Sequence, residues 1–519
     1  MISKRLAAYS IVSIVIVYSI LQFNSYFLFT SGPIELPDNL RLTALYLLVL
    51  CSLFLGQSCL VWYQQTRYKQ AKLLGHTPPP LSFPLLSFEF SFLESTMPLS
   101  RFVEILTLFI LNGWLKASLP IPASADPLQV MANQSAQLAL VNLAVSVVFS
   151  VRRSWFQLKT MVWHAWFGRL AFIQTMVHVS WQLQPLYDHL LNVRHLSGLV
   201  MFSALALLIV GSHPLVRALS YRLFRVTHLV AFLLLVLMGC LHDRLFMVFY
   251  GAVALFWVTD QLDRSFESEH VRLEPLPGNI VRICCQVPYV HDALLPGQFV
   301  LLSFDRSWWK AMFHSHPFSL ARVVDEAGSS CFVFYAKVKG KNTRALYEAS
   351  PDKKIVARLS KPLGNPFITR SGAEFGDYET VVLVAEGVGI TPWILLFQYM
   401  QEKQHVVKTK TLYLLWSIHT IDTWYAFERE LNAFVDAIQL DLSIQVYITG
   451  PEEDETIPNP LPSIQFHYGI RPNYNDAFFD ADNNRPTVLG ICGHPSTMVT
   501  TNNIALTYGW SIRKERFEL

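Results

Sequence analysis

Eight apolar runs, each about as long as a bilayer-spanning helix, occupy most of the first 260 residues. They lie at about 8–29, 42–63, 101–117, 136–152, 162–183, 195–216, 223–242 and 244–260. An apolar segment of roughly 17–25 residues crosses the hydrocarbon core as a helix, because lipid offers an open backbone no hydrogen-bond partner. These runs restrict half of the chain to a helical membrane domain, for which we expect eight spans.

The composition agrees with a membrane location. Hydrophobic residues make up 52% of the 519 residues and charged residues only 15%, which is too apolar for an ordinary soluble protein. Lys4 and Arg5 precede the first run as in a signal peptide, but no small-residue cleavage site follows, so we expect a retained helix. The net charge of +3 and the lack of basic runs interleaved with aromatic residues argue against a nucleic-acid partner.

The basic residues of the connecting loops predict the orientation. With a cytosolic N-terminus, the inner loops carry Arg67, Lys69, Lys72, Arg152, Arg153, Lys159, Arg217, Arg222 and Arg225, and the outer loops carry only Arg41, Arg194 and Arg244. This asymmetry is the positive-inside pattern. We therefore expect an integral, multi-pass protein of the plasma membrane or endoplasmic reticulum, with both termini in the cytosol.

The cysteines indicate neither a disulfide framework nor a zinc site. There are seven, an odd number, and none are spaced as CxxC. The sequence therefore predicts that the soluble part of the chain faces a reducing compartment.

The second half of the chain changes its periodicity twice. From about residue 268, short alternating runs such as VRICCQV and FVLLSF predict antiparallel strands of a small barrel. From about residue 376, the strand VVLVA, the helix WILLFQYMQEK, the strand LYLLW and a helix around YAFERELNAFV alternate, which predicts a parallel sheet. The expected fold is a helical membrane domain, an antiparallel β-barrel and an α/β domain.

Two of the apolar runs carry paired histidines. His164 and His178 lie 14 positions apart, as do His228 and His242. Fourteen helical residues rise about 21 Å and end about 40° short of four turns, so each pair lies near one face with one member toward each leaflet. One span separates the two runs, so they are parallel. His164 is therefore expected level with His228 at the cytosolic side (the inner pair), and His178 level with His242 at the outer side (the outer pair). Two imidazoles per level predict bis-histidine ligation of a haem, whereas a single histidine would satisfy a polar neighbour or relay protons.

The four histidines, the stretch WFGRLA between the first two, and WVTDQLDR after the last run resemble the ferric reductase and NADPH oxidase family of transmembrane flavocytochromes. The resemblance begins near residue 101, and the two runs before it look like an addition to the family's six-helix core. It implies two b-type haems, FAD and NADPH, with a ferredoxin-NADP reductase-like cytosolic module. The expected domains are 1–100 (added helices and a cytosolic loop), 101–264 (haem), 265–370 (FAD) and 371–519 (NADP).

The first cytosolic motif is HPFS at residues 316–319, which resembles the family's flavin-binding motif. The resemblance assigns His316, Pro317, Phe318 and Ser319 to FAD, with Ser319 beside the reacting ring. Pro317 stiffens a strand start, Phe318 is an apolar body, and the Ser319 hydroxyl is able to reach a flavin nitrogen or carbonyl. Without its position after a barrel strand, HPFS would be an ordinary strand start.

A second motif, VKGKNTRALYEA, resembles the family's phosphate-binding turn. Here Gly340 is expected to allow the bend, and Asn342, Thr343 and the helix start are expected to offer donors to the pyrophosphate. A capped surface helix is an equally good interpretation of these residues alone.

The third motif, VVLVAEGVGITPWI, resembles the nicotinamide-binding half of ferredoxin-NADP reductases. Gly387 and Gly389 would let the backbone approach a phosphate before a helix that starts near Thr391 and Pro392. The family more often has a small residue where this chain has Glu386, whose carboxylate would lie near the nucleotide phosphates and weaken cofactor affinity.

Three further stretches near the end of the chain complete the resemblance. In ICGHP, Cys492 and Gly493 match the family's Cys-Gly-Pro, which places the cysteine beside the nicotinamide, and His494 is inserted before the proline. In GIRPN, Arg471 is a candidate for the 2′-phosphate of NADPH, although a solvated arginine is equally compatible. Phe517 in ERFEL resembles the aromatic residue that covers the flavin.

Together the motifs predict a metalloreductase that passes electrons from cytosolic NADPH through FAD and two haems to a ferric or cupric chelate outside. The alternative acceptor is dioxygen, which would make the chain a superoxide-producing NADPH oxidase. Gln182 stands where the oxidase branch carries a further histidine, which favours metal. A non-redox transporter or proton-relay protein with a degenerate reductase domain is the remaining alternative. The sequence leaves any partner subunit open.

Overall fold

The computed structural model describes residues 38–73, 87–92, 95–118, 125–150, 160–188, 192–251, 253, 265–268, 270–287, 296–305, 307, 315–326, 329–349, 355–363, 374–451, 461–481 and 485–515. The chain divides into two compact units, Met1–Trp62 with Val103–Thr259 and Tyr63–Phe102 with Asp260–Leu519. The predicted span at 8–29 and the predicted flavin-covering Phe517 lie outside the described residues.

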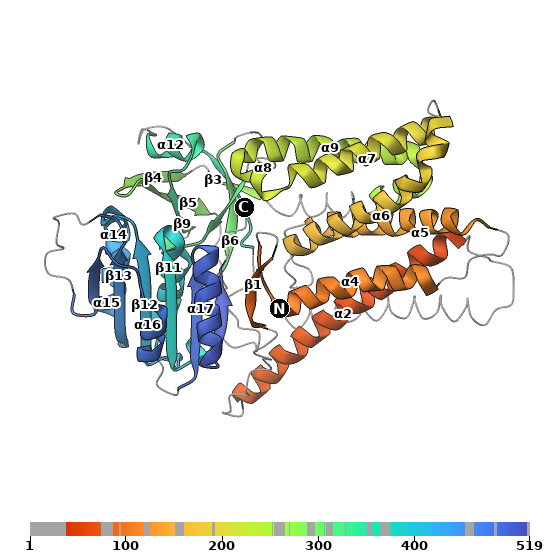
Figure 1. Cartoon of the computed structure of the whole chain (residues 1–519). Coiled ribbons are helices and arrows are strands. Elements are labelled where there is room, and N and C mark those ends of the chain that lie inside the picture. The colour runs from red at the N-terminus through yellow and green to blue at the C-terminus, as the bar shows by residue number, and fades with distance from the viewer. Residues whose placement is uncertain are drawn as a thin grey trace. The chain divides into compact units, whose positions relative to one another are not determined.

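The first unit consists of helices, shown in red to yellow-green in Figure 1. They are α2 (Asp38–Leu73), α4 (Leu99–Ser118), α5 (Pro127–Ser150), α6 (Thr160–Asp188), α7 (Val193–Gly211), α8 (Pro214–Leu219) and α9 (Tyr221–His242), and one end of α2 and of α4 extends into the second unit. Within the described part of the chain, four segments are long and apolar enough to cross a membrane, namely Leu42–Cys59, Pro127–Ser150, Val193–Gly211 and Leu223–His242.

The helices follow the predicted apolar runs, with two differences. The run at 195–216 is broken, because α7 ends at Gly211 and Pro214 begins the separate short helix α8. The run at 136–152 belongs to a longer helix, α5, which begins at Pro127. The runs at 101–117 and 162–183 lie within α4 and α6, and the run at 244–260 is only partly described.

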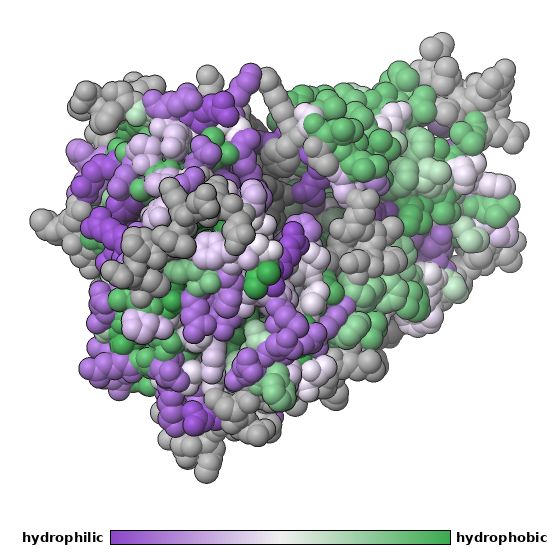
Figure 2. Space-filling view, turned by 60° about the vertical axis from the view of Figure 1, so that its left-hand side comes forward, coloured by the Kyte–Doolittle hydropathy of each residue, from purple (hydrophilic) through white to green (hydrophobic). Residues whose placement is uncertain are grey.

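The surface of the helical unit is apolar. Figure 2 shows hydrophobic side chains gathered over the helices, and α4 exposes Val103, Leu106, Ile110 and Trp114. A water-facing surface rarely carries apolar patches of this kind, and a lipid-facing surface requires them. Inside, small and branched residues of α5, α6, α7 and α9 pack together; they are Leu143, Ala171, Met201, Ala204, Leu205, Ala231 and Leu235.

A buried polar triad joins α2 to the helices that follow it. The hydroxyl of Tyr46 donates to Oδ1 of Asn142 on α5 at 2.7 Å and accepts from Nδ2 of Asn112 on α4 at 2.9 Å. Asn142 Nδ2 in turn donates to Asn112 Oδ1 at 3.3 Å. All three side chains are buried, so the triad fixes α2 against its neighbours in an apolar environment.

The second unit begins its C-terminal part with two antiparallel four-stranded sheets. One has the order β3 (Ser265–Ser268), β10 (Ala357–Ser360), β6 (Phe299–Ser303), β7 (His316–Ser319), and the other has the order β4 (Val271–Leu276), β5 (Ile280–Val287), β9 (Ser329–Lys337), β8 (Arg322–Glu326). Their inner faces share one core that includes Val281, Val300, Phe332 and Leu359. The short helix α12 (Lys341–Tyr347) follows β9.

A six-stranded parallel sheet forms the rest of this unit. Its order is β14 (Ile464–Tyr468), β13 (Asp441–Ile448), β12 (Thr411–Ile418), β11 (Thr380–Glu386), β15 (Thr487–Cys492), β16 (Ser511–Lys514). The connecting helices are η1 (Phe375–Asp377), η2 (Gly387–Ile390), α13 (Thr391–Glu402), α14 (Asp422–Tyr425), α15 (Glu428–Ala437), α16 (Tyr474–Ala481) and α17 (Pro495–Thr507).

Helices cover both faces of the parallel sheet (Figure 1). Alternate residues of β11 enter two different cores: Leu383 packs with Phe397 of α13 and Phe434 of α15, whereas Val384 packs with Phe478 of α16 and Met498 of α17. Burial on both faces explains why this strand is a continuous apolar run and does not alternate.

The structure corrects one expectation about the cysteines. Cys284 of β5 and Cys331 of β9 form a disulfide with a Cα–Cα distance of 6.0 Å. They stand diagonally on two neighbouring antiparallel strands, since Cys331 is opposite Gln286 in the register. The two cysteines are 47 residues apart in the sequence, and this spacing did not indicate that they pair.

A hairpin from the segment between α2 and α4 docks on the parallel-sheet domain. Its strands are β1 (Glu89–Phe92) and β2 (Ser95–Pro98). The side-chain amide of Asn503 on α17 accepts from the backbone N–H of Glu89 and donates to its carbonyl, both at 3.0 Å. The Glu89 carboxylate pairs with Lys514 of β16 at 2.5 Å, with side-chain exposures of 4% and 10%.

Candidate functional site: histidine pairs and the sheet edge

The structure brings His164 and His228 together, as the spacing predicted. Their ring centroids are 6.1 Å apart. Two imidazoles on opposite sides of one metal, with metal–nitrogen bonds of about 2 Å, would have centroids about 6 Å apart. The two rings are therefore at the separation that a shared metal requires.

Hydrogen bonds orient the inner pair. Nδ1 of His164 lies 2.9 Å from the carbonyl oxygen of Ser146 on α5, and Nδ1 of His228 lies 3.1 Å from the hydroxyl of Ser212. Because a carbonyl only accepts, Nδ1 of His164 carries the proton and its Nε2 keeps a free lone pair. Metal-ligating histidines are commonly held in this way.

Hydrogen bonds from Nδ1 to backbone carbonyls also orient the outer pair, His178 and His242. Nδ1 of His178 lies 3.1 Å from the carbonyl of Ala132, and Nδ1 of His242 lies 2.8 Å from the carbonyl of Arg194. Both bonds again leave Nε2 free.

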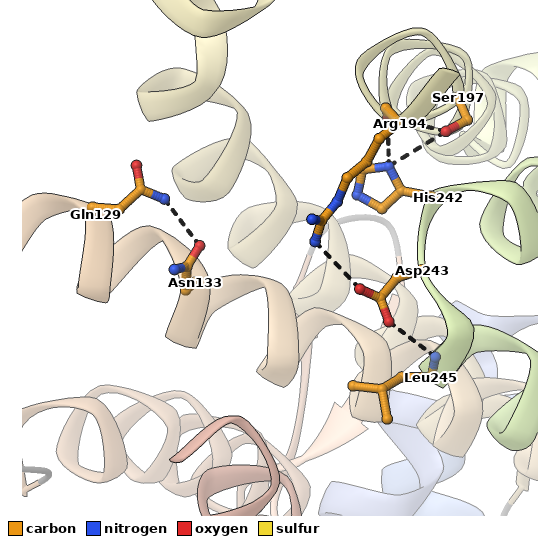
Figure 3. Close-up of polar contacts among 7 residues, drawn as sticks. All are labelled: Gln129, Asn133, Arg194, Ser197, His242, Asp243 and Leu245. Atoms are coloured by element: carbon orange, nitrogen blue, oxygen red, sulfur yellow. Dashed lines mark hydrogen bonds and ion pairs between the residues drawn. The ribbon is translucent and has the colours of Figure 1, made fainter. Parts of the chain in front are cut away.

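The surroundings of His242 explain its position (Figure 3). The ring faces Arg194 and Ser197 at the start of α7, and Asp243 beside it forms an ion pair with the Arg194 guanidinium at 3.3 Å. A Cβ added at Gly198 would lie 2.8 Å from Cε1 of His242, so only a glycine lets the ring lie this close to α7. On α5, Gln129 donates to Asn133 at 3.0 Å (Figure 3).

This donor set fits haem. Within the described ranges, no group of three or more His, Cys, Asp or Glu side chains is arranged to hold a metal ion. The two pairs of imidazoles would instead suit haem, which needs only two ligands from the protein because the porphyrin supplies the others; in His164, His178 and His242 the carbonyl at Nδ1 leaves Nε2 available.

The predicted flavin motif forms the edge strand β7. Pro317 pairs with Leu301 of β6, and no further strand follows on its other side in this sheet. An edge is where a sheet tolerates proline, which lacks the N–H for a ladder bond. Phe318 contacts Phe334 of β9 with ring centroids 6.4 Å apart, and Ser319, opposite Phe299, ends the strand half-buried.

The predicted phosphate turn is a capped helix start. The hydroxyl of Thr343 accepts from the N–H of Lys339 at 3.0 Å and of Gly340 at 3.2 Å. Gly340 has a φ of −150°, and a Cβ added there would meet nothing within 4 Å, so our expectation that the bend needs glycine is wrong. Gly340 and Asn342 are exposed at the start of α12.

The turn after β11 needs both of its glycines. Gly387 has a φ of +53°, and a Cβ at Gly389 would lie 2.6 Å from the carbonyl oxygen of Cys492. Gly389 therefore permits close packing against β15, a role that the sequence did not indicate. The Thr391 hydroxyl donates to the Val388 carbonyl at 2.6 Å, and Pro392 occupies the first turn of α13.

Cys492 ends β15 next to β11 and is fully buried. Burial, reinforced by the charges of Glu515 and Glu386, raises the pKa of its thiol well above the usual value. The group is therefore a neutral thiol and not a thiolate at physiological pH.

The structure separates Arg471 from this cluster. Arg471 is exposed in the loop between β14 and α16, on the same carboxyl edge of the sheet as Glu386 and Cys492. Three strand spacings, about 14 Å, separate β14 from β11. Ligands of such sheets bind outside the carboxyl ends of the strands, and a dinucleotide is long enough to cover this distance.

Three family models match consecutive parts of the chain. The ferric reductase like transmembrane component matches residues 135–239, an FAD-binding domain matches residues 265–411, and the ferric reductase NAD binding domain matches residues 378–506. The first match contains His164, His178 and His228, and the third contains Cys492.

Curated relatives fall into two groups. A probable metalloreductase AIM14 of Meyerozyma guilliermondii is 27% identical over 312 residues, covering 56% of this chain and 59% of that protein. Dual oxidase 1 of Sus scrofa is 25% identical over 279 residues, covering 50% of this chain and 17% of that protein. The chain spans about three fifths of the length of the first relatives that it matches.

Among solved structures, the ferredoxin reductase in carbazole 1,9a-dioxygenase is similar with a TM-score of 0.34 and 17% identity, covering 49% of this chain and 69% of that one. The apolar helices and the matched transmembrane component together make the chain an integral membrane protein.

Proposed function

We propose that this chain, which carries in order the membrane, FAD-binding and NAD-binding parts of the ferric reductase-like proteins, is a transmembrane metalloreductase. In this proposal electrons pass from cytosolic NADPH through FAD and two haems to a ferric or cupric chelate on the other side of the membrane. The separation of the His164 and His228 rings is the observation that carries it.

The four histidines would hold the haems, His164 with His228 and His178 with His242. Haem held there would supply one-electron transfer. In His164, His178 and His242 the hydrogen bond from Nδ1 to a backbone carbonyl keeps Nε2 unprotonated and fixes the ring.

In the second unit, the edge strand β7 would hold FAD through His316, Pro317, Phe318 and Ser319, and the first turn of α12 would meet its pyrophosphate. FAD bound there would supply the chemistry that links a two-electron donor to one-electron carriers. The carboxyl edge of the parallel sheet would bind NADPH, with Gly387 and Gly389 in the turn, Cys492 and Gly493 by the nicotinamide, and Arg471 by the 2′-phosphate. The last antiparallel strand ends at Ser360 and the first parallel strand begins at Thr380, which supports a division near residue 371.

The hairpin supports the proposed orientation. Ser87 to Pro98 belong to the loop between two membrane helices, and Glu89 contacts Asn503 and Lys514 of the nucleotide-binding domain. The loop and this domain must therefore lie on the same side of the membrane, which is the cytosol by the positive-inside pattern.

The test begins with anaerobic, detergent-solubilised protein and NADPH. We expect bleaching of the flavin together with sharp b-type haem bands in the difference spectrum, and then reoxidation by a ferric chelate under nitrogen. Superoxide formed in air, with no reduction of ferric or cupric chelates under nitrogen, would replace the proposal by an oxidase. Protein that retains no haem would overturn both and favour the transporter alternative.

A further inference from the structure

The two residues at which the nucleotide motifs depart from the family pattern, Glu386 and the inserted His494, contact each other. Oε2 of Glu386 accepts from the backbone N–H of His494 at 2.5 Å, and Oε1 accepts from the Thr497 hydroxyl at 2.7 Å. Both donors belong to the start of α17: His494 is its N-cap residue and Thr497 lies in its first turn. The carboxylate of β11 therefore caps a helix that follows a different strand.

The residues around the Glu386 carboxylate leave room for it and support its contact with α17. A Cβ added at Gly493 would lie 2.8 Å from Oε2 and 3.1 Å from Cδ of Glu386, so the glycine makes room for the carboxylate. The Tyr474 hydroxyl bonds to the side chains of Thr497 and Ser417, and thereby holds Thr497 from the other side. The half-buried carboxylate is thus held by groups that follow β15 and lie in the first turn of α17.

The N-terminus of a helix carries a partial positive charge and free N–H groups, which attract phosphate. At α17 the N–H of Ser496 donates to Nδ1 of His494 at 3.4 Å, and the Glu386 carboxylate adds a negative charge beside this first turn. The neighbouring start of α13 differs, because among the side-chain hydrogen bonds that the described residues make there is no carboxylate cap at Gly387–Thr391. Unlike the start of α17, the turn before α13 therefore has no side-chain cap among the described residues.

We propose that Glu386 and His494 act as one unit that closes the start of α17 to phosphate and so directs the diphosphate of the nicotinamide nucleotide to the turn before α13. Glu386 is a residue that determines nucleotide affinity and position, and it takes no part in hydride transfer. The inference rests on the proposed nucleotide site at this edge. Its failure is distinguishable from failure of that proposal, because the unmodified protein must still be reduced by NADPH.

The first test uses Glu386→Gln with inorganic pyrophosphate as the probe. The neutral amide retains the geometry, since its oxygen accepts from His494 and its NH₂ donates to the Thr497 hydroxyl. Loss of the negative charge should make pyrophosphate inhibit flavin reduction about 3- to 10-fold more strongly and should lower the KM for NADPH by a similar factor, with kcat unchanged or reduced. Inhibition that is unchanged or weaker would overturn the proposal.

The matched control is Glu379→Gln. Glu379 precedes the same strand β11, at the amino end of the sheet, and pairs with Lys410 at the surface. The Glu379→Gln variant loses the same charge far from the carboxyl edge, so its inhibition by pyrophosphate and its KM for NADPH should not change. An equal effect in both variants would show that overall charge, and not the cap, governs affinity, and would also overturn the proposal.

A second test couples the two residues. Deletion of His494 places Pro495, which has no N–H, directly after Gly493, so the Glu386 carboxylate loses its backbone donor. The deletion alone should therefore lower the melting temperature, and Glu386→Gly added to it should restore part of the loss and raise nucleotide affinity. Purely additive effects of the two changes would contradict the inference that they form one unit.

Discussion

The backbone carbonyl of Arg194 accepts a hydrogen bond from Nδ1 of His242 at 2.8 Å. Arg194 lies in the first turn of α7 and His242 is the last residue of α9, so the orientation of the imidazole depends on how these two helices pack. The side chain of Arg194 also pairs with Asp243, the residue after His242. Arg194 therefore contacts the end of α9 through both its backbone carbonyl and its side chain.

The first prediction concerns Gly198, one turn along α7. In Gly198→Ala the new methyl group would lie 2.8 Å from Cε1 of His242 and push the ring from its position. We expect loss of one haem, or a shift in the potential of one haem, while the second haem and FAD remain. Gly168→Ala is the control, because a Cβ added there would lie 3.6 Å from the Ser146 hydroxyl, which is an ordinary van der Waals contact. Redox titration and the haem-to-flavin ratio measure both outcomes.

The second prediction separates the two haem levels. His178→Ala should remove the outer haem and leave FAD bound, so NADPH still bleaches the flavin and reduces the remaining haem. Reduction of external chelates should fall at least 10-fold, because the path to the outside is interrupted. A haem stoichiometry of two in this variant would show that His178 is not a ligand.

The third prediction concerns Tyr46 in the triad that holds α2. Tyr46→Phe removes the hydroxyl that bridges Asn112 and Asn142, and should cost about 0.5–2 kcal/mol of stability in the membrane domain. Thr175→Val is a control, since that hydroxyl bonds only within its own helix to Ala171 among the hydrogen bonds described. Thermal loss of the haem absorbance reports the difference, and equal midpoints for the two variants would contradict it.

The fourth prediction follows from the raised pKa of Cys492. In the folded protein this thiol should resist iodoacetamide even at pH 9, and should react readily in urea. The raised pKa also predicts how stability depends on pH. Above about pH 9 the thiol of the unfolded chain loses its proton while the thiol of the folded chain keeps it, so the free energy of unfolding falls as the pH rises. Peptide-level mass spectrometry of labelled protein gives the rates.

The fifth prediction concerns the buried ion pair of the hairpin. Glu89→Gln removes the negative charge that faces the buried ammonium of Lys514, and should lower the free energy of unfolding of the second unit by about 3 kcal/mol. Lys410→Gln breaks a pair of the same chemistry at the surface, with side-chain exposures of 64% and 32%, and should cost less than about 1 kcal/mol. Hydrogen exchange in α17 would locate the effect.

The fold and the histidine pairs could be predicted because both depend on local periodicity. Apolar runs report helices in lipid directly, and 14-residue spacing on two parallel helices needs no knowledge of their contacts. The start of α5 was not predicted. The helix begins at Pro127, but Gln129, Asn133 and Gln134 lower the hydropathy of its first turns, so the apolar run in the sequence begins only at residue 136.

Contacts between distant segments could not be predicted. Glu386 and His494 are 108 positions apart, and in the sequence each was a separate departure from the family pattern. The disulfide between Cys284 and Cys331 depends on the register of β5 against β9, which sequence patterns do not specify. Gly340 was assigned a conformational role that its extended backbone does not require, because a glycine in a turn is compatible with many values of φ.

The hairpin also sets an order of events during synthesis. Glu89 and Asn503 are 414 positions apart, so at about 5–20 residues per second the ribosome completes the partner about 20–80 s after the hairpin emerges. For most of that time the membrane helices on either side are already made, while Glu89 on β1 has not yet met Asn503. In the proposed orientation, agents that shield exposed strands in the cytosol would act on this protein during that interval, and the nucleotide-binding domain would be the last part of the chain to become complete.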